Sequence, residues 1–474
     1  MDMLIASEIA AGISAAGLSY LGLQSYGYGA KYWQIKDPEL RRTHRDAARV
    51  RRTWMRLARY LRLSLRDDIP TMRDAMFTDR SRAQQPKIRV PRIRKIDNDA
   101  FGVTIDFASI PGVGLEEFVK ACDHLANHWR MTRVSAHQPE PGVIRVRAVR
   151  RDPLTIPLAV GTPRNPRRLD YFPAGLDEYG EIVTIRLKNS SGVGVYGLPG
   201  YGKTSFILGL ISYFALSPAV QFVVADGKVE TGLEGDYQDV ADRCAVVIGD
   251  DIATFNALLK QLRDLRRLRS STIRQTLGTP NVWDVGPSED WPLIIVVIDE
   301  CHTYFQQVKD GGNPELKKRN AMAAENVLLV EDLGKKGRSV GIIPMPATQK
   351  STGEAIPTQI RDVMTTAISF AVRTEEAAVA ALGADIKNWP DAHPLTFLSE
   401  EYIGVASMVA AGRPGFTRFR SPHCRSAVAA AISEQAAHLV KPETLPGITI
   451  GQSHRAIAPG TAAALLPHID KITD

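Results

Sequence analysis

The sequence predicts an α/β fold in which helices cover both faces of a parallel sheet. Three observations carry this prediction. Residues 197–204 form a phosphate-binding loop of the pattern G-x-x-x-x-G-K-[ST]. An aliphatic run at residues 292–298 ends in two acids, Asp299 and Glu300. From about residue 191 onward, short apolar runs alternate with segments of helical periodicity, which is typical of parallel sheets.

The phosphate-binding loop predicts a site for ATP and Mg²⁺. Its glycines allow a tight turn with backbone N–H groups directed at the phosphates. Lys203 can reach the β- and γ-phosphates, and the Thr204 hydroxyl can ligate Mg²⁺. Residues 192–196 fit a buried strand before the loop, and residues 205–214 fit a helix after it. The residues expected to bind the nucleotide are Gly197, Leu198, Pro199, Gly200, Tyr201, Gly202, Lys203, Thr204 and Ser205.

The two acids after the aliphatic strand fit a Walker B pattern. Asp299 can hold Mg²⁺ opposite Thr204, and Glu300 can orient the attacking water, so Glu300 and Lys203 are predicted to be catalytic. Gln349 follows the next predicted strand, at residues 342–347, and is our candidate for sensing the γ-phosphate. The neighbouring Thr348 could instead simply end that strand.

Composition and spacing divide the chain of 474 residues into five predicted regions. Residues 96–155 combine strands at 101–107 and 143–149 with a helix at 114–129, which indicates a small α/β lead-in domain. The five regions are an apolar segment at 1–30, a basic helical arm at 31–95, the small α/β domain at 96–155, the main α/β domain at 156–424, and a helix and loosely ordered tail at 425–474.

The net charge of +7 is concentrated in the basic arm. Residues 31–95 hold 20 Lys and Arg against 7 Asp and Glu, which indicates an acidic partner or a solvated surface. The four cysteines form no C-x-x-C pair, so the sequence excludes a zinc ribbon or disulfide framework and fits the cytoplasm.

Contact with the inner face of the cell membrane is a second expectation for the N-terminal regions. Residues 9–23 carry no charge but fall short of the ~20 residues that span a bilayer. An apolar stripe on the predicted helix at 38–66, formed by Trp54, Leu57, Leu61 and Leu65, suits a membrane interface. The alternative is that the stripe packs on a neighbouring subunit while the arginines face duplex DNA.

The motifs together resemble the FtsK/SpoIIIE family of double-stranded DNA translocases, in the short form of actinobacterial plasmid and integrative-element transfer proteins. The matches are GLPGYGKT (197–204), ADGK (225–228), VVIDE (296–300), LGKKGRSVGI (333–342) and ATQKS (347–351). The resemblance implies a RecA-like P-loop NTPase domain, ATP hydrolysis coupled to movement of double-stranded DNA, and a homo-hexameric ring. Such a ring is needed because a single RecA-like domain finds its second half in a neighbour.

Basic residues downstream of the acids are the predicted DNA contacts. A helix from Pro314 ends in a basic turn that we expect next to the ATP site, where Lys335, Lys336 and Arg338 could bind phosphates. Arg338, Arg361 and Arg373 are equal candidates for an arginine that acts on the nucleotide of a neighbouring subunit.

Three other functions compete with this interpretation. The sequence DECH at 299–302 also fits a DExH helicase, but no Q-x-x-G-R-x-x-R motif follows it. A type IV coupling protein that moves single-stranded DNA is the closer rival. The third is a DNA- or membrane-binding scaffold whose ATP site controls assembly. We expect His302 to be a packing residue after the acids rather than a metal ligand.

Overall fold

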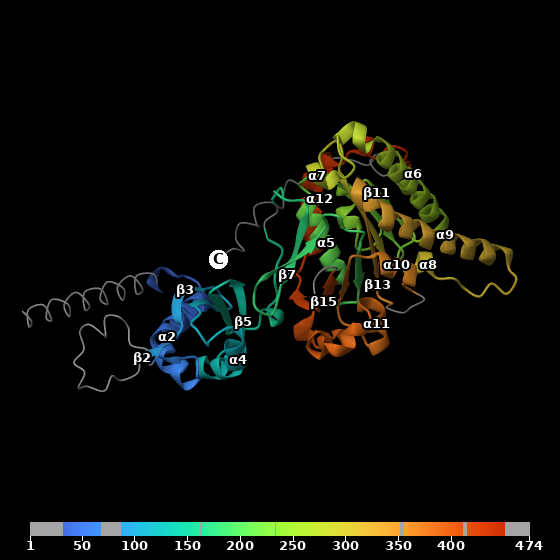
Figure 1. Cartoon of the computed structure of the whole chain (residues 1–474). Coiled ribbons are helices and arrows are strands. Elements are labelled where there is room, and N and C mark those ends of the chain that lie inside the picture. Colours follow the sequence, from blue (N-terminus) through green and yellow to red (C-terminus); the bar gives the residue numbers. More distant parts are fainter. Residues whose placement is uncertain are drawn as a thin grey trace, which may run out of the picture. The chain divides into compact units, whose positions relative to one another are not determined.

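A computed structural model describes residues 32–67, 87–161, 164–232, 234–350, 355–410 and 415–450. The chain divides into two compact units, unit 1 (Met1–Pro153) and unit 2 (Leu154–Asp474) (Figure 1). The predicted apolar segment at 1–30 lies outside the described residues. Across the described ranges, no helix combines the length and apolar character needed to cross a bilayer.

Unit 1 is a four-stranded antiparallel sheet with two helices packed on it. The strand order is β3-β4-β6-β5, and a separate two-stranded ribbon pairs β1 with β2. The elements are α2 (Pro38–Tyr60), β1 (Leu65–Asp67), β2 (Lys87–Arg89), β3 (Arg92–Asn98), β4 (Gly102–Ala108), α4 (Leu115–Trp129), β5 (Arg133–Glu140) and β6 (Val143–Val149).

The helix of the predicted basic arm belongs to the core of unit 1. Trp54 of this helix, α2, is 3% exposed. Its ring centroid lies 4.2 Å from that of Phe107 on β4 and 5.9 Å from that of Phe118 on α4. The Trp54 indole donates to the carbonyl of Pro91 at 2.6 Å. Leu57 is also buried there. The expectation that Trp54 and Leu57 face a membrane or a neighbouring subunit is therefore wrong, because unit 1 already covers both. Leu61 is partly buried in the same core, and Leu65 lies on β1 rather than on the helix.

Unit 2 has the predicted α/β architecture. Its elements are β7 (Tyr171–Leu176), β8 (Ile182–Arg186), β9 (Val193–Tyr196), α5 (Lys203–Phe214), β10 (Val220–Asp226), β11 (Val246–Ile248), α6 (Ile252–Leu277), α7 (Val282–Val285), β12 (Leu293–Asp299), α8 (His302–Phe305), α9 (Pro314–Gly337), β13 (Ile342–Thr348), α10 (Thr358–Val363), β14 (Thr366–Ser369), α11 (Glu375–Leu382), β15 (Val405–Ala410), β16 (Thr417–Arg420) and α12 (Ser426–Ala436).

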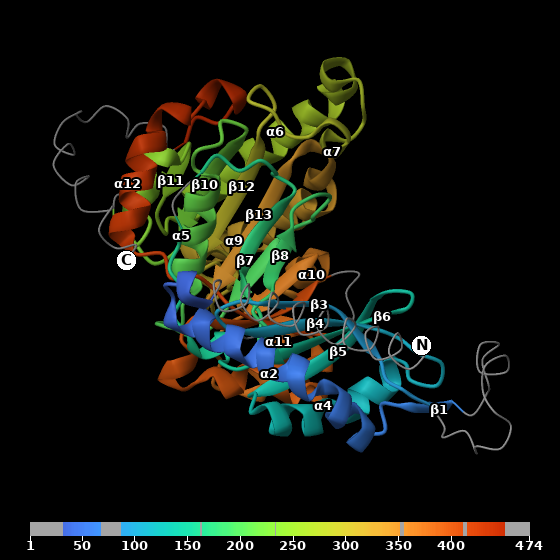
Figure 2. The ribbon, with the colours of Figure 1, turned by 90° about the vertical axis from the view of Figure 1, so that its left-hand side faces the viewer.

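The ten strands of unit 2 form one sheet in the order β11-β10-β12-β13-β9-β14-β15-β16-β7-β8. The first six run parallel, and the last four continue the sheet in antiparallel fashion. Figure 2 shows the central strands side by side. The strand order confirms the predicted parallel sheet and adds an antiparallel half that the sequence analysis did not identify.

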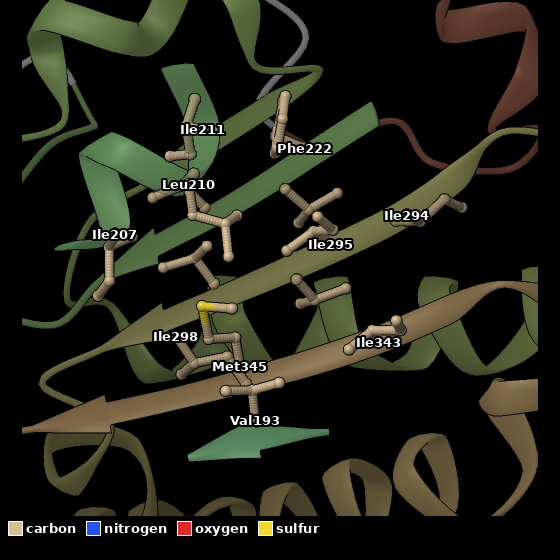
Figure 3. Packing of buried hydrophobic residues seen from close by; sticks show 14 of the residues in the cluster. Val193, Ile207, Leu210, Ile211, Phe222, Ile294, Ile295, Ile298, Ile343 and Met345 are labelled. Carbon is tan, nitrogen blue, oxygen red and sulfur yellow. The ribbon is translucent and has the colours of Figure 1, made fainter. Parts of the chain in front are cut away.

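Aliphatic side chains fill the space between the parallel strands and α5 (Figure 3). β12 contributes Ile295 and Ile298 to this core, and Ile207 and Leu210 of α5 are buried in the same cluster. This packing holds the first turn of α5 in place against the ends of the strands. Leu445 and Ile448, which fall in the region expected to hold a helix and a loosely ordered tail, are also buried in this cluster.

Candidate nucleotide site

Five parallel strands of unit 2 end at one edge of the sheet. The register aligns Asp226 with Asp299 and aligns Tyr196 with both Thr348 and Ser369, so β10, β12, β13, β9 and β14 finish together. Ligands of open α/β sheets bind at this carboxyl edge. It carries the phosphate-binding loop, the acid pair and the described parts of the ADGK and ATQKS motifs.

The phosphate-binding loop takes a conformation that requires its glycines. Gly197, Gly200 and Gly202 have φ angles of +143°, +80° and +106°, a region that other residues rarely adopt. A Cβ atom on Gly197 would also lie 2.6 Å from Cβ of Phe370. Helix α5 then begins at Lys203, which brings its free N–H groups and positive dipole end to the same edge.

Two later segments of unit 2 hold the loop in place. Tyr201 donates its hydroxyl to the carbonyl of Leu398 at 2.9 Å, and Gly404 N–H donates to the Tyr201 carbonyl at 3.1 Å. The Ser205 hydroxyl accepts from the backbone N–H of Cys424 at 2.8 Å. The Ser205 side chain is thus engaged with the segment before α12, and its contact with a nucleotide stays a prediction.

Lys203 lies between the two acids at the end of β12. The whole residue Lys203 is only 3% exposed. Its ammonium donates to Oδ1 of Asp299 and, at 2.9 Å, to Oε1 of Glu300. Burial alone would lower the pKa of Lys203, but the two carboxylates outweigh it and raise that pKa. Lys203 therefore contacts both of the acids that motif spacing predicted as the centre of the site.

Glu300 has a strained backbone and a fully engaged carboxylate. Its φ angle of +46° is uncommon for a residue with a side chain. Oε2 accepts from the Gln349 N–H and the His302 Nδ1, each at 3.2 Å, and from the Thr348 hydroxyl at 3.4 Å. Burial would raise the pKa of Glu300, but the His302 hydrogen bond and the Lys203 charge hold it at about 2. His302 thus contacts the candidate catalytic acid and is not only the packing residue that we expected.

Two buried residues that the sequence analysis did not assign to the site lie beside Asp299. Tyr237 donates its hydroxyl to Oδ2 of Asp299 at 2.9 Å. Asp226 is the register partner of Asp299 on β10, and its Oδ1 accepts from the Lys228 N–H at 3.0 Å. Burial and the neighbouring Asp299 charge raise the pKa of Asp226 to about 6. The ADGK motif marks Asp226, but no local signal marks Tyr237.

The chemistry of these residues fits ATP with Mg²⁺. Thr204 offers a hydroxyl in the first turn of α5, and Asp299 offers a buried carboxylate, the hard oxygen donors that Mg²⁺ prefers. When bound, Mg²⁺ would neutralise the charge that develops on the phosphates. Lys203 would bind the phosphates, and the Glu300 carboxylate, ionised at neutral pH, could orient a water and accept its proton.

The structure corrects the position of the basic turn. Lys335 and Lys336 end α9, and Arg338 follows them, before β13 begins at Ile342. Because the site lies where β13 ends, the turn is at the opposite edge of the sheet, about 20 Å away along a seven-residue strand. Lys335 and Lys336 also pair with Glu331 and Asp332 on α9, both at 2.5 Å.

The three candidate arginines occupy different places. Arg373 is exposed just after β14, two residues from Ala371, whose carbonyl accepts from the Leu198 N–H of its own phosphate-binding loop at 2.9 Å. Arg361 is held within unit 2 by the Ala380 carbonyl and the Thr358 hydroxyl. Arg338 is exposed at the opposite edge and makes no ion pair with another described residue.

Comparison with known proteins finds likeness in fold. No family model matches the chain, and no curated protein sequence does. Among solved structures, the conjugation coupling protein TcpA of pCW3, in monomer form with ATPγS, is 18% identical, with a TM-score of 0.49 over 74% of this chain and 94% of that one.

Two further solved structures resemble the chain over a smaller part. The cytoplasmic domain of the Type VII secretion ATPase EccC of Thermomonospora curvata is 18% identical, with a TM-score of 0.41 over 59% of this chain and 32% of that one. The genome packaging NTPase B204 of Sulfolobus turreted icosahedral virus 2, with ATP-gammaS, is 11% identical, with a TM-score of 0.28 over 49% and 98%.

Proposed function

We propose that the chain is an ATPase that couples ATP hydrolysis to the movement of double-stranded DNA. The observation that best supports ATP hydrolysis is the contact of Lys203 with both Asp299 and Glu300 at the carboxyl edge of the sheet. Phosphoryl transfer needs positioning and charge neutralisation, which these groups and Mg²⁺ on Thr204 and Asp299 would supply. Gln349, whose backbone already contacts Glu300, remains the candidate γ-phosphate sensor.

The finer parts of the proposal come from the motif resemblance. We propose that the working form is a homo-hexameric ring of the FtsK/SpoIIIE type and that it serves conjugative transfer of a plasmid or integrative element. The order of the motifs supports this assignment, and the basic character of residues 31–95 supports a polyanionic partner. We place the protein in the cytoplasm. Peripheral contact with the inner face of the cell membrane stays a prediction.

DNA-stimulated ATP hydrolysis tests the proposal. Duplex DNA should raise the hydrolysis rate of the full chain more than single-stranded DNA does. Stimulation by single strands alone would identify a coupling-protein-like motor, and nucleotide binding without any stimulation would identify a scaffold.

Two variants test the site itself. Glu300→Gln should bind ATP normally but hydrolyse it about 100-fold or more slowly, because only the water-orienting carboxylate is lost. Lys203→Ala should weaken ATP binding, because the phosphates lose their cation. Full turnover by Glu300→Gln would overturn the assignment of the catalytic acid.

A further inference from the structure

The solvent face of α2 carries a continuous row of arginines. Successive members are three or four residues apart, so all six lie on one face of the helix. Each is exposed. We call this row the α2 arginine row, and it consists of Arg42, Arg45, Arg49, Arg52, Arg56 and Arg59.

Packing of the opposite face of α2 in the core of unit 1 keeps the α2 arginine row exposed to solvent. Val50, Trp54 and Leu57 are buried against the sheet of unit 1. Asp46, also buried, accepts from Arg150 of unit 1 at 2.9 Å. The helix therefore cannot turn its arginines inward without losing its core, and Figure 2 shows it as a long rod lying along β3 and β4.

Few carboxylates neutralise the row. The whole of α2 holds eight arginines and only two acids, Glu39 and Asp46. Glu39 pairs with Arg42 at 2.7 Å, and Asp46 lies 4.0 Å from Arg49. Within the described part of the chain, Arg45, Arg52 and Arg59 form no ion pair. Ordinary protein surfaces mix charges of both signs, so this face has an excess of positive charge that a polyanion would complement.

The dimensions of the row fit the backbone of duplex DNA. At 1.5 Å per residue, the row from Arg42 to Arg59 extends about 25 Å. One strand of B-form DNA presents about seven phosphates over that length, at 3.4 Å each. Guanidinium groups bind phosphates through two parallel N–H donors. An anionic membrane is the less suitable partner, because an interfacial helix inserts its apolar face, and that face of α2 is buried.

We propose that the α2 arginine row binds the phosphate backbone of double-stranded DNA. This inference rests on the proposed function and deepens it. It assigns DNA binding to unit 1, whereas unit 2 would use ATP hydrolysis to move the same DNA. Contacts of this kind hold DNA without reading its sequence, so the affinity should fall steeply with salt and depend little on base composition.

The test is the salt dependence of DNA binding by the full chain. The triple variant R45Q/R52Q/R59Q removes three exposed, unpaired cations and leaves the buried face of α2 intact. Binding of a labelled duplex of mixed sequence, without nucleotide, is titrated at several KCl concentrations. The slope of log K against log salt should become shallower by about 2.7, or about 0.9 for each lost phosphate contact. DNA-independent ATP hydrolysis should stay unchanged.

Two matched variants exclude simpler explanations. R45K/R52K/R59K keeps the charges and should keep most of the slope. R267Q/R274Q/K318Q removes three exposed cations from α6 and α9 of unit 2 and should leave the slope nearly unchanged. An equal loss in this last variant would mean that only net charge matters and would overturn the proposal.

Remaining outcomes separate this inference from the proposed function. An unchanged slope in R45Q/R52Q/R59Q, with duplex binding by the native chain intact, would overturn the α2 proposal alone. Failure of the native chain to bind duplex DNA would overturn the proposed function. Loss of binding to phosphatidylserine vesicles with DNA binding unchanged would assign the row to a membrane and also overturn the proposal.

Discussion

The backbone of Glu300 occupies the left-handed region, which costs a residue with a side chain of order 1–3 kcal/mol. This conformation places the Glu300 carboxylate within hydrogen-bond distance of Lys203, His302 and the Gln349 N–H. The sequence predicted Glu300 because its motif is local. It did not predict the contact of Tyr237 with Asp299, because these residues are 62 positions apart in the chain. His302 is only two residues from Glu300, but the motif alone does not show which way its side chain turns.

Tyr237→Phe is predicted to weaken Mg²⁺-dependent nucleotide binding. The variant removes the hydrogen bond to Oδ2 of Asp299 and leaves that oxygen free to reorient, a loss that typically costs 10-fold or more in metal affinity. Mg²⁺ titration of the binding of a fluorescent ATP analogue measures this effect. Tyr304→Phe is the matched control, because it removes a hydroxyl that bonds only the Gly249 carbonyl, at 2.7 Å. Equal Mg²⁺ dependence in both variants would contradict the role of Tyr237.

Asp226→Asn is predicted to stabilise the protein at neutral pH. The pKa of Asp226 is about 6 in the folded protein, above its unfolded value of about 3.9, so ionisation favours the unfolded chain. The ionised Asp226 carboxylate lowers the free energy of unfolding, and this effect is absent below about pH 4 and complete above about pH 6. Above that pH, removing the charge should raise the free energy of unfolding by roughly 1–3 kcal/mol. Thermal unfolding of the nucleotide-free variant from pH 4 to pH 8 measures it.

Asp251→Asn gives the opposite sign and serves as the comparison. The hydrogen bond from Thr254 lowers the pKa of Asp251, which caps the first turn of α6. Its charge therefore stabilises the folded protein above the unfolded pKa, and this gain is lost as the pH falls. The variant should be less stable than the native chain at neutral pH and approach it in acid. A gain in both variants at neutral pH would refute this assignment.

At the scale of elements, the sequence predicted the parallel strands better than the antiparallel ones. Continuous aliphatic runs predicted β12 and β13, because buried parallel strands need no polar face. Strands β5 and β7 were missed, since Pro139 and Pro173 interrupt them. Helix α2 was predicted, but its arginines suggested a separate arm, and only the packing of Trp54 shows that it belongs to a core.

Trp54→Ala is predicted to destabilise unit 1 by about 3–5 kcal/mol, as large aromatic truncations in a core do. The ring is buried between α2, β4 and α4, so its loss leaves a cavity that three elements share. Urea unfolding followed by circular dichroism measures the change. Met55→Ala, one residue along α2 but 58% exposed, should change the stability by about 0.5 kcal/mol or less. Similar small effects in both variants would mean that α2 does not support unit 1.

At the scale of the whole molecule, the proposed ring predicts that Arg338 completes the site of a neighbouring subunit. An arginine that acts between subunits must face away from its own nucleotide. Arg338, at the opposite edge of the sheet, meets this condition. Arg338→Ala and Glu300→Gln subunits should each be nearly inactive, but mixed rings should regain hydrolysis where an intact Glu300 meets an intact Arg338.

Arg373 provides the contrast in that experiment. It lies two residues from Ala371, which bonds its own phosphate-binding loop, so Arg373→Ala should not be rescued by Glu300→Gln subunits. ATP hydrolysis is measured across mixing ratios, with each variant alone as the baseline. Rescue of Arg373→Ala but not of Arg338→Ala would exchange the roles of the two arginines.

The strand order of unit 2 also affects how the chain folds as it leaves the ribosome. The hairpin of β7 and β8 is made before the parallel strands, yet β7 pairs with β16 through Leu176 and Arg420, 244 residues apart. At a synthesis rate of 5–20 residues per second, β16 is made roughly 10–50 s after β7, and the edge of β7 that pairs with it stays unpaired for that time. Pro173 and the register shift between Pro173 and Gly175 blunt that edge meanwhile, because an irregular strand is a poor template for pairing with another nascent chain.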